Sequence, residues 1–445
     1  MKFIYPKIRY LAPFLTAALL LVACGGSDGF GVGVSYLAPF GGTKQMGVAG
    51  KSTTGTSTAT DANGNVYVAG VTYGGLDGNT LTGNADFFLT KYDATGIKLY
   101  TKQMGVAGVN TVANAVATDA SGNVYVAGFT EGGLDGNTPT GISDFFLTKY
   151  DPSGTKLYTK QMGASGVNTS ASRVTTDASG NVYVAGFTGG GLDGNTPTSA
   201  KDLFLTKYDV TGNKLYTKQM DGMGLTGEVG GIDANGNVYY TGYTGIGLDG
   251  NTQTGTMDLF LIKYSASGIK LYTKQMGVVG HFVRGYSTAT DANSNTYVTG
   301  YTDGGLDGNT LMGTNDFFLT KYDASGNKLY TRQLGVAGKS TSPSSVAVDA
   351  DGSVYVTGNT TGGLDGNTLS GTNDLFLTKY DINGIKLYTK QLGVTGKSIY
   401  PWYNAADANG NVFVTGSTNG GLDGNALTGT YDFFLVKYKS AGTKQ

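Results

Sequence analysis

The sequence has one cysteine, one histidine and one tryptophan in 445 residues. One cysteine cannot build a disulfide framework, and with a single histidine it cannot supply the ligands of a structural zinc site. Charged residues make up 14% of the chain, against roughly 25% in an ordinary soluble domain. Basic residues number 31 and acidic residues 32, so no positive excess exists to neutralise phosphates. We therefore expect no nucleic-acid partner.

Glycine (74 residues) and tyrosine (30 residues) are abundant instead, and much of the glycine lies in a repeat. The pentapeptide Gly-Leu-Asp-Gly-Asn occurs seven times, beginning at positions 75, 133, 191, 247, 305, 363 and 421. The copies are 58 residues apart except for one interval of 56. A fixed period of this size marks a repeat architecture, so we expect one body of stacked units.

Each unit reads as four short strands separated by turn residues. Val66 and Val68 would lie on one face of the second strand and Tyr67 and Val71 on the other, so both faces are apolar. A sheet of this kind must be covered twice, as stacked blades are. We predict an all-β, seven-bladed β-propeller of four-stranded antiparallel blades. In the first unit the expected strands are residues 57–60, 65–72, 86–92 and 98–104.

The two ends of the repeat region complement one another. The last unit stops inside its fourth strand at Gln445, whereas residues 43–47 match the missing piece, represented in the first unit by residues 101–105. We therefore expect an N-terminal strand to complete the last blade and close the ring, with the propeller spanning residues 43–445.

The repeated pattern is specific enough to resemble a known family. D-A-x-G-N-V-Y-V-x-G-x-T, followed by D-x-F-L-x-K-Y-D-x-x-G-x-K-L-Y, resembles the bacterial SBBP repeat, which is named for its seven-bladed β-propeller. The resemblance extends over about 400 residues. It implies the fold and an extracytoplasmic setting, and it implies no activity and no catalytic residues.

The first residues resemble a bacterial lipoprotein signal. Lys2, Lys7 and Arg9 precede an apolar run at residues 11–23, and the chain continues Leu-Val-Ala-Cys, ending at Cys24. The resemblance implies a signal peptide at residues 1–23 and diacylation of the Cys24 thiol. Residues 24–42 would then form a glycine-rich tether. The alternative is a plain secretory signal followed by an incidental cysteine.

A lipid anchor would place the protein in the cell envelope. Each buried methylene contributes about 0.8 kcal/mol, so two or three acyl chains hold a protein firmly on a bilayer. In Gram-negative lipoproteins an Asp after the cysteine favours retention in the inner membrane, whereas Gly25 occupies that place here. We therefore expect an outer-membrane location, with the face of the membrane left open.

The segments that join one unit to the next carry most of the variation. They are expected to be loops on the rim that also carries the pentapeptides, and loops on a rigid scaffold commonly bind ligands. Aromatic residues beside hydrogen-bonding groups suit a sugar or a peptide. The alternative is drift among copied repeats, with aromatic residues plugging the channel mouth. The candidate ligand-binding residues are His281, Arg284, Tyr286, Tyr400, Trp402 and Tyr403.

The pentapeptide itself has two interpretations. It can be a tight turn that uses Asp, Gly and Asn for positive φ, or a calcium site with ligands such as Asp77, Asn79 and Asp86. The lack of a bidentate Glu favours the turn. Residues 61–65 imitate the opening of an EF-hand loop, but Thr72 stands where that loop needs Glu, which favours a hairpin turn.

We therefore predict a monomeric, membrane-anchored binding or interaction module that is not an enzyme and has no resident cofactor, although calcium stays possible. Its ligand would be an unidentified protein, peptide or glycan. One alternative is a lectin-like or calcium-dependent carbohydrate-binding propeller. Another is a propeller hydrolase or lyase with its site at the channel mouth, although a single histidine cannot be assigned to any particular nucleophile.

Overall fold

The computed structural model describes residues 40–222, 226–233 and 235–445, which belong to the compact unit Ala38–Gln445. Within these ranges no helix is both long and apolar enough to cross a membrane. The predicted signal peptide (residues 1–23), Cys24 and the tether as far as residue 39 lie outside the described residues. Those assignments therefore stay predictions.

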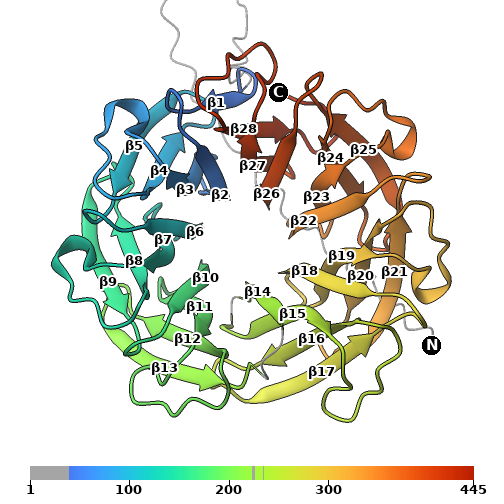
Figure 1. The fold of residues 1–445 in the computed structure, drawn as a ribbon, viewed down its shortest axis with the longest axis horizontal. Coiled ribbons are helices and arrows are strands. Elements are labelled where there is room, and N and C mark those ends of the chain that lie inside the picture. Colours follow the sequence, from blue (N-terminus) through green and yellow to red (C-terminus); the bar gives the residue numbers. More distant parts are fainter. Residues whose placement is uncertain (1–39, 223–225, 234) are drawn as a thin grey trace, which may run out of the picture. The chain divides into compact units, whose positions relative to one another are not determined.

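The compact unit consists of seven four-stranded antiparallel sheets arranged around a centre (Figure 1). This confirms the predicted seven-bladed β-propeller. The innermost strands are β2 (Thr53–Thr60), β6 (Thr111–Thr118), β10 (Thr169–Thr176), β14 (Thr226–Ile232), β18 (Val283–Thr290), β22 (Thr341–Val348) and β26 (Ile399–Ala406). The second strands are β3 (Val66–Thr72), β7 (Val124–Thr130), β11 (Val182–Thr188), β15 (Val238–Thr244), β19 (Thr296–Thr302), β23 (Val354–Thr360) and β27 (Val412–Thr418).

The third strands are β4 (Asp86–Tyr92), β8 (Asp144–Tyr150), β12 (Asp202–Tyr208), β16 (Asp258–Tyr264), β20 (Asp316–Tyr322), β24 (Asp374–Tyr380) and β28 (Asp432–Tyr438). The outer strands are β5 (Lys98–Met104), β9 (Lys156–Met162), β13 (Lys214–Met220), β17 (Lys270–Met276), β21 (Lys328–Leu334), β25 (Lys386–Leu392) and β1 (Lys44–Met46). Four pentapeptides include a short 3-10 turn: η1 (Leu76–Gly78), η2 (Leu134–Gly136), η3 (Leu306–Gly308) and η4 (Leu364–Gly366).

The hairpin between the first two strands of a blade is fixed by one aspartate. In blade 1 (β2 to β5), Asp61 Oδ1 accepts hydrogen bonds from the backbone N–H groups of Asn63 (2.9 Å) and Asn65 (3.0 Å). Asp61 Oδ2 accepts from Asn65 Nδ2 at 2.7 Å and from the Tyr67 hydroxyl at 3.0 Å. The carboxylate thus replaces backbone partners in the turn, which confirms the hairpin interpretation of residues 61–65.

The pentapeptide is also a turn. Asp77 (φ 55°) and Gly78 (φ 79°) adopt the left-handed region, as predicted, whereas Asn79 does not (φ −72°). Asn79 Nδ2 instead donates to the carbonyl oxygen of Leu76 at 2.8 Å, and Asp77 is ion-paired with Lys98 on the outer strand. The turn therefore ties the loop to the outer edge of its own blade.

Strand β1 completes the seventh blade, as the sequence predicts. It pairs with β28 in antiparallel register, with Gln45 opposite Phe434. Gln45 Nε2 donates to the buried Asp432 Oδ2 at 3.0 Å, and Gln45 Oε1 accepts from the Leu422 N–H at 2.9 Å. The ring is therefore closed by hydrogen bonds and packing between the two ends of the compact unit.

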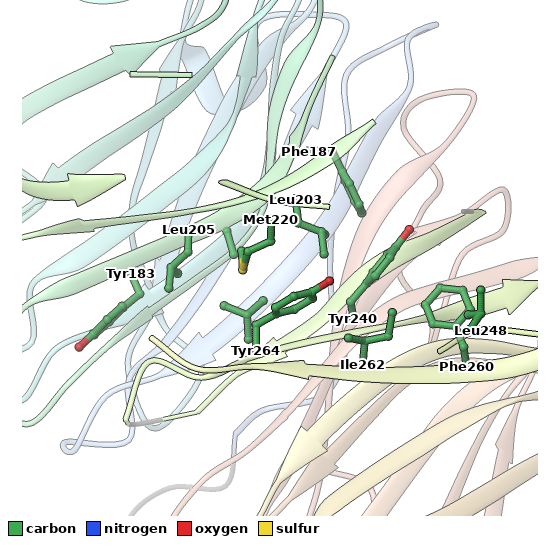
Figure 2. Close-up of a cluster of buried hydrophobic side chains, with 12 residues drawn as sticks. Tyr183, Phe187, Leu203, Leu205, Met220, Tyr240, Leu248, Phe260, Ile262 and Tyr264 are labelled. Atoms are coloured by element: carbon green, nitrogen blue, oxygen red, sulfur yellow. The ribbon is translucent and has the colours of Figure 1, made fainter. Parts of the chain in front are cut away.

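The core lies between neighbouring blades. In Figure 2, side chains from blade 3 (β10 to β13), among them Phe187, face side chains from blade 4 (β14 to β17), among them Tyr240. These two rings meet edge to face, with centroids 5.7 Å apart. Because each sheet buries both faces against its neighbours, the ring is rigid and positions what lies at its centre.

Candidate ligand-binding site

Each innermost strand contains one β-bulge, where its register against the second strand shifts by one residue. In blade 1 the shift lies between Gly55 and Ser57, so Thr56 has no partner of its own on β3. In blade 4 it lies later in the strand, between Val229 and Gly231. In the other six blades the bulge residues occupy the same place in the repeat: Thr56, Asn114, Ser172, Tyr286, Ser344 and Trp402.

All six of these bulge residues line one pocket of about 980 Å³, inside the ring of innermost strands. The volume lies at the upper end of the range of small-molecule sites. A bulge re-aims a side chain without ending the strand, so six blades contribute side chains to a common cavity. We call this cavity the central pocket.

Two exposed aromatic side chains, Tyr286 and Trp402, line the central pocket. Tyr286 is 40% exposed and Trp402 is 54% exposed. Tyr286 stacks on Tyr301, with ring centroids 5.5 Å apart and an interplanar angle of 23°. Burial, together with the neighbouring Tyr301 hydroxyl, raises the pKa of Tyr286 to about 12. The result is a fixed aromatic wall beside open space.

A second cavity of about 350 Å³, which we call the aromatic cleft, lies against the innermost strands of blades 5 (β18 to β21), 6 (β22 to β25) and 7 (β26 to β28 with β1). It shares Tyr286, Ser344 and Trp402 with the central pocket. Its other walls are Tyr301, Tyr400, Pro343, Pro401, Asn315, Ser342 and Asn359.

Arg173 and Tyr403 contact one another from blades 3 and 7. The guanidinium carbon of Arg173 lies 5.5 Å from the centroid of the Tyr403 ring, and Arg173 Nη1 donates to the carbonyl oxygen of Ser172 at 2.8 Å. Both residues also line a separate cavity of about 340 Å³, bounded by the later parts of the innermost strands. They therefore form the floor of the central pocket.

The structure brings four of the six predicted ligand-binding residues to these cavities: Tyr286, Tyr400, Trp402 and Tyr403. Arg284 lies beside them but is enclosed by rings. Its guanidinium carbon is 4.7 Å from the Tyr243 centroid and 4.9 Å from the Phe282 centroid, and Nη1 donates to the Tyr301 hydroxyl at 3.1 Å. Arg284 thus supports the Tyr301 wall.

His281 lies apart from these cavities. The residue follows the end of β17, in the connection between blades 4 and 5. Its Nδ1 lies 3.4 Å from Asp303 Oδ1. Among the described residues that line the central pocket there is no histidine, cysteine, aspartate or glutamate.

The prediction that these residues sit in connecting loops is wrong for five of the six, because the innermost strands begin earlier than expected. Strand β2 starts at Thr53 rather than at residue 57. The backbone N–H of Thr53 donates to the carbonyl oxygen of Tyr431 in the neighbouring blade at 2.9 Å, which draws the connection into the sheet. The same contact joins Val283 to Met257 (2.8 Å) and Ile399 to Asn373 (2.9 Å).

The candidate calcium ligands are engaged by protein groups. Asp77 is ion-paired with Lys98, and the buried Asp86 accepts hydrogen bonds from the Thr82 and Gly83 N–H groups at 2.8 Å each. Gln103 Nε2 adds a third bond to Asp86, at 2.9 Å. In the part of the chain that the structure describes, no group of three or more His, Cys, Asp or Glu side chains is placed to hold a metal ion.

Five segments of the chain match the family model of the SBBP beta-propeller repeat: residues 42–77, 99–135, 157–193, 329–365 and 387–423. The regulatory protein FlaEY of Caulobacter vibrioides is 30% identical over 222 residues, which cover 44% of this chain and 23% of FlaEY. An uncharacterised WD repeat-containing protein of Acanthamoeba polyphaga mimivirus is 24% identical over 418 residues, covering 68% of this chain and 30% of that protein.

This chain thus spans less than a third of the length of these two relatives. The WD40 β-propeller domain of Doa1 is similar in structure, with a TM-score of 0.47 and 11% identity over 90% of this chain and 98% of that domain. Five repeat matches and seven four-stranded blades agree with the sequence pattern: this chain contains SBBP beta-propeller repeats, arranged as a seven-bladed β-propeller.

Proposed function

We propose that this protein is an extracytoplasmic, non-catalytic binding module whose ligand occupies the central pocket. One observation carries the proposal. Between otherwise near-identical blades, the bulge residue is Thr, Asn, Ser, Tyr, Ser or Trp, and all six line the same cavity. Different side chains that meet in one cavity are what a site for an asymmetric ligand requires, and binding residues are commonly carried on irregular positions of a rigid scaffold.

The chemistry of the lining supports binding rather than turnover. The described lining offers aromatic faces, hydroxyl groups, amides and two cationic side chains, Arg173 and Lys201. A hydrolase or lyase needs an acid and a base near the reacting bond, usually carboxyl or imidazole groups. If the enzymatic alternative holds, a bound ligand should be cleaved on incubation, which product analysis would detect.

The test is a binding screen of the purified full-length chain on glycan and peptide arrays. We expect ligands whose binding falls at least tenfold in Trp402→Ala. Tyr73→Ala is the matched control, because Tyr73 is a 46% exposed aromatic residue outside the cavities described above. Ligands retained by Trp402→Ala, or lost equally in Tyr73→Ala, would refute the placement of the site.

We further propose that Cys24 carries the lipid that anchors the module in the cell envelope, at the outer membrane. The lipoprotein-like sequence around Cys24 supports this. Labelled palmitate should be incorporated into the parent chain and not into Cys24→Ser, and the variant should leave the membrane fraction. Equal labelling of both would refute the anchor without affecting the binding proposal.

A further inference from the structure

We infer that the ligand of the central pocket is an oligosaccharide of several sugar units, which lies across Trp402 and continues into the aromatic cleft. The inference rests on the proposed function, because it names the ligand class of the same site.

The first support is the pairing of flat aromatic faces with small polar groups. A pyranose ring presents an apolar C–H face that packs on an aromatic ring, and hydroxyl groups around its edge that need hydrogen bonds. Tyr286 and Trp402 provide exposed rings. Beside the cationic Arg173 and Lys201, the uncharged polar side chains of the same pocket are short amides and hydroxyls: Thr56, Asn114, Asn168, Ser170, Ser172, Thr188 and Ser344.

The bonds of Asn114 show how such a group is held ready. Asn114 Nδ2 donates to the Ala171 carbonyl oxygen at 2.8 Å and to Ser170 Oγ at 3.3 Å. These contacts join the innermost strands of blades 2 (β6 to β9) and 3, and they fix the amide through its nitrogen. The amide oxygen remains the group that can accept a bond from a ligand hydroxyl.

The second support concerns the length of the ligand. Trp402, Tyr286 and Ser344 line both the central pocket and the aromatic cleft, so the two cavities meet at these side chains. Together they extend from the innermost strands of blades 1 to 3 to those of blades 5 to 7. A single sugar would occupy one cavity, whereas a chain of sugars can contact both.

The edges of the innermost strands disfavour the competing ligand, an extended peptide. Each innermost strand is the end strand of its sheet, so its free edge could in principle pair with a peptide strand. The bulges interrupt the edges that face the pocket, and Pro343 and Pro401 remove an N–H donor one residue before two of them. An ordered ladder with a peptide backbone is therefore disfavoured there.

The experiment is isothermal titration calorimetry with oligosaccharide series, each containing a monosaccharide, a disaccharide and a tetrasaccharide of the same polymer, chosen from the glycan array. A proline-rich peptide series serves as the competing ligand class, because aromatic grooves also bind such peptides. We expect at least one tetrasaccharide to bind at least tenfold more tightly than its disaccharide.

Three pocket variants and one control variant assign the binding. Trp402→Ala and Tyr286→Ala should each weaken the tetrasaccharide at least tenfold, and Trp402→Phe should restore most of the affinity because it keeps an aromatic face. Tyr73→Ala should leave it unchanged. If only peptides bind, and Trp402→Ala abolishes that binding, the ligand class is wrong and the site stands.

Equal affinity for disaccharide and tetrasaccharide would overturn the extended placement. Glycan binding that Trp402→Ala does not change would overturn both the inference and the proposed site. Absence of any bound glycan would overturn the inference. Circular dichroism spectra matching the parent would show that each variant is folded, so a loss of binding can be attributed to the pocket.

Discussion

Gln45 closes the ring, and its replacement offers a direct measure of how much closure contributes to stability. The same glutamine recurs in blade 2 as Gln161, with equivalent bonds. Gln161 donates to Asp144 Oδ2 (2.9 Å) and to the Gly132 carbonyl oxygen (3.1 Å), and it accepts from the Leu134 N–H (2.9 Å). Gln45 makes its three bonds to Asp432 (3.0 Å), Gly420 (3.2 Å) and Leu422 (2.9 Å).

The local cost of either substitution to alanine follows from these three bonds. Two bonds to backbone groups contribute about 1 kcal/mol each, and the bond to a buried carboxylate contributes about 1.5–3 kcal/mol. Each variant should therefore lose about 4 kcal/mol of unfolding free energy, a large part of the 5–15 kcal/mol typical of folded proteins.

Gln45→Ala should cost at least about 1 kcal/mol more than Gln161→Ala. Strand β9 is joined by a hairpin to β8 of its own blade, whereas β1 has only three residues and no direct chain connection to β28, the strand with which it pairs. When β1 detaches, the blade also loses Phe40, which is 1% exposed and lies 5.7 Å from the Phe413 ring centroid. The two variants therefore separate the glutamine's own bonds from ring closure.

The assay is urea unfolding followed by far-ultraviolet circular dichroism, paired with limited proteolysis at residues 40–47. We expect a lower midpoint for Gln45→Ala than for Gln161→Ala, and cleavage of the N-terminal strand in the former alone. Equal losses of free energy with no new cleavage would refute the reasoning, because β1 would then behave like any other outer strand.

Three further outcomes follow. Gly47→Ala should destabilise the fold, because a Cβ at Gly47 would lie 1.7 Å from Asp432 Oδ1. Gly50→Ser is the control: a Cβ at Gly50 meets nothing within 4 Å, and the substitution costs only the strain of a positive φ (68°). The melting temperature of Gly47→Ala should therefore be the lower of the two. The hydrogen bonds from Thr211 and Asn213 lower the pKa of Asp209 to about 2. The charged carboxylate therefore stabilises the blade 3 turn above its ordinary pKa of about 3.9, and this stabilisation is lost as the pH falls through about 2. Carboxyl NMR should show a titration midpoint near 2, and Thr211→Ala should raise that midpoint. The melting temperature should be equal in calcium and in chelator, since the pentapeptide aspartates are ion-paired with lysines; a rise in calcium would show that the metal displaces them.

The blade could be predicted in detail because its signals are local and repeated seven times. The strands at residues 86–92 and 98–104 were expected at their observed limits, since β-branched and aromatic residues are bounded by Asp-x-x-Gly turns. The innermost strand was expected four residues too short, because its first residues are held by the neighbouring blade, which no local propensity reports.

The site was only partly predictable for the same reason. Unusual residues drew attention to Tyr286 and Trp402, whereas Thr56, Asn114, Ser172 and Ser344 are ordinary residues that gain their role from the bulge. Aligning the seven units would have revealed that they share one column with Tyr286 and Trp402. No sequence signal showed that Arg173 would reach Tyr403 from blade 3, because that contact depends on the ring being closed.

The bulge position separates the lining of the central pocket from the folding of the blade. A bulge residue has no partner of its own on the second strand, so its side chain can change while the ladder on both sides of it stays the same. Duplication of a blade therefore copies the scaffold and adds one further variable side chain to the pocket. Under the proposed function, six such side chains, each open to substitution on its own, would let the ligand selectivity of the ring change one blade at a time.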